Sequence, residues 1–153
     1  MRAIEPWVED PLRTFLQESA SRVVLLMTSA GQVVAQHGFT RSMDVMSAAA
    51  LGAGIVASSE EIGRIVGDAG LGAQAHQGSR QGIVLSPFMT PVGRWIALVV
   101  YGPETSLGLV QLFLGRMVTD LRVAAPVEQV TRPVLAEDFE RDLNASLRSL
   151  FGR

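Results

Sequence analysis

The sequence contains no cysteine and no lysine, so all 13 of its basic residues are arginine. Without cysteine, disulfide bonds, thiolate metal sites and cysteine nucleophiles are excluded. The only two histidines, His37 and His76, form no H-x-x-x-H or H-x-E cluster of the kind that holds a metal ion. A G-x-S-x-G nucleophile elbow is also missing. We therefore expect no metal site, no catalytic residue and no enzymatic activity within this chain.

The chain also has no large excess of either charge, with 13 basic and 15 acidic residues. The net charge of -2 and the pI near 5.7 give no basic surface for nucleic acid. The N-terminal segment lacks the apolar core of a signal peptide. The longest charge-poor stretch, Val45 to Ser59, is about 15 residues long and too short to span about 30 Å of hydrocarbon. These absences predict a cytoplasmic protein that neither inserts into membranes nor binds nucleic acid.

What the sequence does have is a long helical segment rich in small residues, from Met43 to Gly67. Gly52 and Gly54 each cost about 1 kcal/mol inside a helix, and such a cost is typical where another backbone must come close. The segment is therefore predicted to be a contact surface. Helical spacing places one set of residues toward the sheet: Ala48, Ile55, Ile62 and Val66. The predicted partner-binding residues are Met46, Ala50, Ala53, Gly54, Ala57, Glu61 and Arg64.

The same segment contains Gly52 to Ala57, which matches the dinucleotide pattern G-x-G-x-x-A. That pattern binds phosphate only where it follows a strand and opens a helix, because free backbone N–H groups are needed there. Here the helical periodicity starts about two turns earlier. Packing is therefore the favoured interpretation, nucleotide binding remains an alternative, and no cofactor is expected.

Periodicity and turn residues predict eight elements in the order α-β-β-α-β-β-β-α. The predicted helices cover 10–20, 41 or 42–66, and 106–123; the predicted strands cover 22–28, 33–37, 73–77, 82–86 and 94–101. Residues 87–91 are predicted to be a turn. Short connections favour a five-stranded, mainly antiparallel sheet with helices on both faces, an α/β (α+β) sandwich of three layers α/β/α.

The C-terminal part is predicted to be separate from this domain. Residues 1–125 form the domain, 126–134 a linker with proline near each end, and 135–153 an amphipathic helix. Two interpretations of this helix stay open: its apolar face packs on its own domain, or it meets a partner.

The third predicted strand has no charge or proline to prevent pairing at its edge. If this strand ends the sheet, a second copy can pair with it. The predicted dimer interface is Ala73, Gln74, Ala75, His76 and Gln77.

Three segments together resemble the Roadblock domain family: Ile62-Gly-Arg-Ile-Val-Gly67, the turn from His76 to Gly82, and WIALVVYGPETSLGLVQLF. Within that family the sequence is most similar to bacterial MglB-type proteins, over about residues 10 to 125. The resemblance implies a Roadblock/profilin-like fold and a homodimer whose long helices lie side by side.

The resemblance also implies a function. MglB-type proteins stimulate GTP hydrolysis by a small Ras-like GTPase of the MglA type, in cell polarity and motility. They order the switch regions of that GTPase and supply no catalytic residue of their own. The chain is accordingly expected to be a homodimeric GTPase activator; a Roadblock scaffold that holds a GTPase complex without changing turnover is the alternative.

Overall fold

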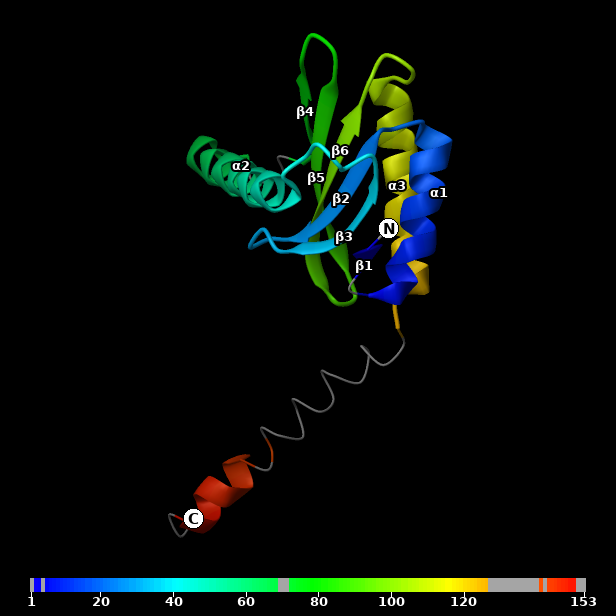
Figure 1. Ribbon diagram of the computed structural model, residues 1–153. Coiled ribbons are helices and arrows are strands. Elements are labelled where there is room, and N and C mark those ends of the chain that lie inside the picture. The colour runs from blue at the N-terminus through cyan, green and yellow to red at the C-terminus, as the bar shows by residue number, and fades with distance from the viewer. Residues whose placement is uncertain (1, 4, 69–71, 127–140, 142, 151–153) are drawn as a thin grey trace.

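The computed structural model describes residues 2–3, 5–68, 72–126, 141 and 143–150 of the chain (Figure 1). The helices are the 3-10 helix η1 (Pro6–Val8), α1 (Glu9–Ser19), α2 (Val45–Val66) and α3 (Leu107–Ala124). The strands are β1 (Arg2–Ala3), β2 (Val23–Thr28), β3 (Val33–Gly38), β4 (Gln74–Gln77), β5 (Gly82–Thr90) and β6 (Gly93–Tyr101). The eight predicted elements are all present and in the predicted order.

The strands form one antiparallel sheet in the order β1-β3-β2-β6-β5-β4. The five predicted strands are confirmed, and the short β1 adds a further strand beside β3. β6 lies between β2 and β5, which explains why Trp95 to Val99 are all buried. β4 lies at the end of the sheet, as the sequence analysis required for an edge strand.

Helices cover both faces of this sheet (Figure 1). α1 and α3 pack against each other on one face, where Leu12, Phe15, Met117 and Leu121 are among the largest fully buried side chains. Among the described residues, α2 is the one helix that covers the other face. The predicted three-layer α/β/α sandwich is thereby confirmed.

Two local predictions were wrong. β5 continues to Thr90, so the predicted turn over residues 87–91 is mostly strand. A proline fits there because β4 pairs only as far as Leu85, and Pro87 beyond it lies on a free edge that needs no N–H donor. Asp10 precedes Pro11 and is the residue that the sequence predicts as the N-cap of the first helix. It lies inside α1 instead and forms an ion pair with Arg13.

The helices α2 and α3 both begin at recognisable N-caps, and α2 also ends at a C-cap. Asp44 and Ser106 accept backbone hydrogen bonds at the first turns of α2 and α3, from Ser47 at 3.1 Å and Leu109 at 3.3 Å. α2 ends at Gly67, whose φ of 78° is easiest for glycine. These caps fix the length of α2, on which the candidate site depends.

Residues 141 and 143–150 are helical, and Leu143, Leu147 and Leu150 are exposed there. The rest of the predicted linker and C-terminal helix lies outside the described residues, except Pro126.

Candidate protein-docking surface

The first part of the candidate surface is the outer edge of β4. One side of this strand pairs with β5, from Gln74 opposite Leu85 to Gln77 opposite Gly82. No described strand pairs with its other side. Ala75, His76 and Gln77 are exposed and Gln74 is half-buried, whereas Ala73 precedes the strand. The structure therefore places four of the five predicted dimer residues on a free sheet edge.

The second part is α2, which lies against the sheet through its smallest residues. The buried positions of α2 are Ala49, Gly52, Ala53, Val56 and Gly63. A Cβ on Gly52 would come within 3.1 Å of Leu85 Cδ2 and 3.3 Å of Leu98 Cδ1. The glycine therefore serves contact with the chain's own sheet.

This packing corrects the predicted orientation of α2. Ala48, one of the residues expected to face the sheet, does pack against it. The other three, Ile55, Ile62 and Val66, are 41%, 57% and 67% exposed. Ala53 was expected to face a partner, but it is buried against the sheet. The expectation failed because it assigned the large apolar residues to the core, whereas close approach to the sheet requires the small ones.

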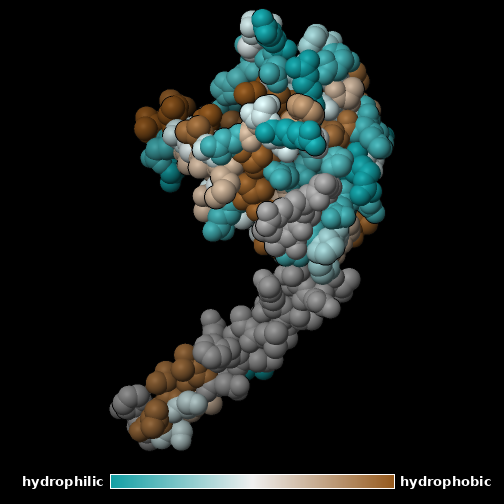
Figure 2. All heavy atoms as spheres, viewed as in Figure 1, coloured by the Kyte–Doolittle hydropathy of each residue, from teal (hydrophilic) through white to brown (hydrophobic). Residues whose placement is uncertain are grey.

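The outward side of α2 consequently carries a row of large apolar side chains. We call this row the apolar stripe: Leu51, Ile55, Ile62, Ile65 and Val66. Figure 2 shows apolar atoms gathered over the α2 end of the molecule. Single exposed apolar residues are ordinary, but five large ones on one side of a helix indicate a contact surface. The sequence signal that could have found it is the set Gly52, Val56 and Gly63, which shares one helical side.

The remaining predicted partner-binding residues are exposed beside the stripe. They form what we call the small flank: Met46, Ala50, Gly54, Ala57, Glu61 and Arg64. Glu61 and Arg64 form an ion pair with each other. The structure thus brings six of the seven predicted residues to the surface of α2 and excludes Ala53.

An ion pair joins α2 to the sheet next to this surface. Arg94 at the start of β6 donates a hydrogen bond to Glu60, which holds the pKa of that carboxyl below its usual range. The same hydrogen bond raises the pKa of Arg94. Both side chains are partly exposed, so the pair contributes little to stability but restrains the orientation of α2.

Nucleotide, metal and membrane sites find no support in this geometry. Gly52 is well inside α2, where backbone N–H groups are already used by the helix, so Gly52 to Ala57 lacks the strand-to-helix turn that phosphate needs. Within the described residues there is no cluster of potential metal ligands. The expectation that the apolar stretch is too short to span a membrane was wrong, because α2 extends over Val45–Val66 and is long and apolar enough by length and composition alone. Its small residues nevertheless pack on the sheet.

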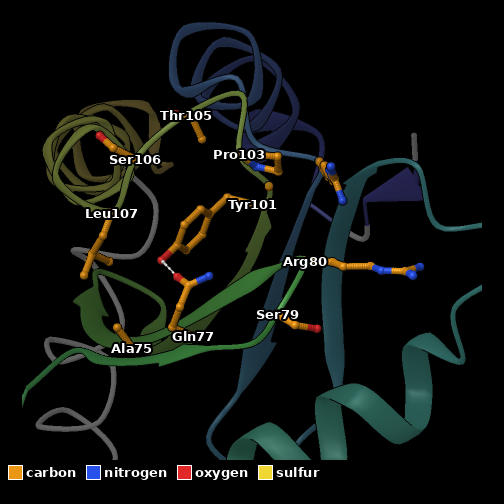
Figure 3. A pocket seen from close by; sticks show the side chains of 11 residues that line it. Ala75, Gln77, Ser79, Arg80, Tyr101, Pro103, Thr105, Ser106 and Leu107 are labelled. Carbon is orange, nitrogen blue, oxygen red and sulfur yellow. Dashed lines mark hydrogen bonds between the residues drawn. The ribbon is translucent and has the colours of Figure 1, made fainter.

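A cavity of about 740 Å³ lies beside β4 on the face of the sheet opposite α2 (Figure 3). Tyr101 and Gln77 are at its centre, and the Tyr101 hydroxyl donates a hydrogen bond of 3.0 Å to Gln77 Oε1. The Tyr101 ring lies over Gly82, where a Cβ would clash at 2.2 Å. Sequence reasoning did not anticipate this cavity, because it forms only where the β4–β5 hairpin meets the start of α3.

Comparison with known proteins identifies the fold. The sequence matches no protein-family profile and none of the curated proteins. The structure, however, is that of a Roadblock domain of the kind found in MglB. It is similar to Myxococcus xanthus MglB with a TM-score of 0.70 and 24% identity, over 78% of this chain and 94% of that one.

Two further solved structures agree. The gliding protein MglB from Thermus thermophilus matches with a TM-score of 0.68 and 24% identity, over 78% of this chain and 88% of that one. A Roadblock/LC7 domain from Streptomyces avermitilis matches with a TM-score of 0.62 and 18% identity, over 82% of this chain and 95% of that one. At these identities the likeness establishes the fold, and the resemblance stated from the sequence is confirmed at that level.

Proposed function

We propose that the chain is a homodimeric regulator that stimulates GTP hydrolysis by a small Ras-like GTPase of the MglA type, without an active site of its own. The observation that carries this proposal is the exposed apolar stripe of α2 in a Roadblock fold whose sheet ends at an unblocked strand. The setting we propose is cytoplasmic, in cell polarity or gliding motility.

Dimerisation follows from two surfaces that need covering. An unpaired strand edge offers a row of N–H and C=O groups to a second copy of β4. The apolar stripe offers side chains that gain about 25 cal/mol per Å² when they leave water. A dimer with two-fold symmetry covers both surfaces at once, because it pairs each surface with the same surface of the second copy.

Such a dimer leaves the small flank of α2 available for the GTPase. Ala50, Gly54 and Ala57 of this flank are small enough for a partner backbone to approach closely. Glu61 and Arg64 supply the polar rim that protein interfaces carry. The small flank is therefore our proposed GTPase contact.

The mechanism we propose is a shift of population in the GTPase. Hydrolysis needs a positioned water molecule and stabilised charge on the transferred phosphoryl group. A regulator that binds the hydrolysis-competent switch arrangement more tightly raises its population. Each tenfold acceleration requires about 1.4 kcal/mol of differential binding, which an interface without a catalytic side chain can supply.

The test is single-turnover phosphate release by an MglA-type GTPase, with and without the full-length protein. We expect at least a tenfold acceleration, and Glu61→Arg in the small flank should reduce it at least tenfold while the protein stays dimeric. Val123→Glu is the matched control, because Val123 is 82% exposed on α3, on the other side of the sheet. Unchanged hydrolysis despite tight binding would reject activation and support the scaffold alternative.

A further inference from the structure

The cavity beside β4 contains a positive charge that has no partner among the residues that the structure describes. Of the two arginines that line it, Arg22 is already neutralised by Glu104, with Nε–Oε1 at 2.8 Å and Nη2–Oε2 at 3.2 Å. Arg80, at the tip of the β4–β5 hairpin, is exposed and has no ion pair or hydrogen bond to any residue that the structure describes. Figure 3 shows the Arg80 side chain extending away from Tyr101 and Gln77, so a negatively charged group that it binds would lie at the edge of the cavity.

The other residues that line the cavity suit a peptide segment that carries apolar side chains between charged ones. Ala75, Leu107 and the Tyr101 ring provide apolar wall, and Ser79 and Ser106 provide hydroxyl groups. Gln77 is held in place, because its Oε1 accepts from Tyr101 and its Nε2 donates to the Gly78 carbonyl at 3.0 Å. The walls are thus set by the protein's own hydrogen bonds before any ligand arrives.

The chain itself contains a segment of complementary chemistry. Residues 135–142 read LAEDFERD, with four acidic residues among the six from Glu137 to Asp142. Leu135 and Phe139 are spaced between these acids. We propose that the cavity binds this acidic segment of the chain's own C-terminal part, with a carboxylate at Arg80 and an apolar side chain against Tyr101.

The length of the intervening chain permits this. Leu107 lines the cavity, while the chain leaves α3 at its other end, after Ala124. An 18-residue helix is about 27 Å long. The residues from 125 to 137 reach about 40 Å when extended at roughly 3.3 Å per residue. The segment can therefore return along α3 to its own cavity, and tethering at an effective concentration of about millimolar makes weak contacts sufficient.

Because the cavity includes Ala75 and Gln77 of β4, an occupied cavity would lie next to the strand edge proposed above for dimerisation. The docking itself does not depend on dimerisation or on any GTPase.

Two introduced cysteines test the docking in the full-length protein, since the natural chain has none. Ser79→Cys with Ala136→Cys places one thiol in the cavity and one at the acidic segment. The control pair is Thr119→Cys with Ala136→Cys, because Thr119 is exposed on α3 nearer the point where the chain leaves that helix. We expect disulfide formation to be at least tenfold faster for the Ser79 pair, although chain proximity alone favours the control.

Charge variants test whether the faster disulfide formation depends on contact between Arg80 and the acidic segment. Arg80→Glu, or the neutral set Glu137→Gln, Asp138→Asn, Glu140→Gln and Asp142→Asn, should lower the rate to that of the control pair. Arg13→Glu reverses an exposed charge outside the cavity and should leave the rate unchanged. A cross-link within one chain supports the docking, whereas a cross-link formed only between two chains would overturn it in favour of a second copy. Equal rates for the two cysteine pairs, or no response to Arg80→Glu, would overturn it.

Discussion

The two faces of the sheet are covered with different amounts of side chain. On one face α1 and α3 lie together and bury large residues such as Phe15 and Leu121. On the other, α2 lies alone and contacts the sheet through alanine, glycine and Val56. The first face is a closed core, whereas the second leaves the large side chains of α2 exposed. An outer helix can therefore hold its sheet with small residues and present large ones outward.

The largest expected effect tests the closed face. Phe15→Ala should lower the free energy of unfolding by about 3–5 kcal/mol, because it removes a fully buried ring. Val56→Ala on the α2 face should cost only about 2 kcal/mol, since it removes two methyl groups. Urea denaturation of both variants measures the difference. Equal losses in the free energy of unfolding would mean that α2 packs on its face of the sheet as tightly as α1 and α3 pack on theirs.

The second prediction separates two glycines of α2. Gly52→Val should cost about 1–3 kcal/mol, because its side chain would press on Leu85 and Leu98. Gly54→Ala should add about 1 kcal/mol to stability, because nothing lies within 4 Å of the new Cβ and alanine favours the helix. Urea denaturation at one protein concentration compares the two. A destabilised Gly54→Ala protein would contradict the orientation of α2.

The third prediction concerns the apolar stripe. Leu51→Ser should weaken dimerisation about tenfold, or about 1.4 kcal/mol, because Leu51 is 69% exposed in one chain and would be covered in the dimer. Analytical ultracentrifugation over a dilution series gives the dimer dissociation constant. Leu112→Ser is the control, since Leu112 is 64% exposed on α3. The same constant for both variants would remove the stripe from the interface.

The smallest effect concerns the cap that begins α2. Hydrogen bonds from the Ser47 side chain and backbone N–H lower the pKa of Asp44 from its ordinary 3.8. A carboxyl whose folded pKa is lowered stabilises the protein above its unfolded pKa, and that contribution is lost as the pH falls below about 3.8 toward the folded value. Thermal unfolding from pH 5 to pH 2 should show this loss.

Asp44→Asn provides the matched control, because asparagine caps a helix about as well and does not titrate. The variant should lack this part of the acid-induced loss. An identical pH profile for both proteins would show that Asp44 makes no titrating contribution.

Much of the fold could be predicted because its signals are local. Ser106 marks the start of α3, and Gly67 marks the end of α2. The continuous apolar run of β6 indicates a strand that is covered on both faces. Pro87 was misread because a proline excludes a strand only where its missing N–H is needed, and that depends on where β4 ends.

The sequence by itself determined the order of elements and the antiparallel sheet, because periodicity and turn chemistry act over a few residues. The structure then placed β4 at the edge of that sheet. Only the tertiary structure decided which side of α2 faces the sheet and how Arg22, Arg80 and Tyr101 come together in one cavity. The physical reason is that alanine and glycine give a helix little preference for either side. Packing therefore decides the orientation of α2. The side that faces the sheet is the one whose small residues allow the helix to approach closely.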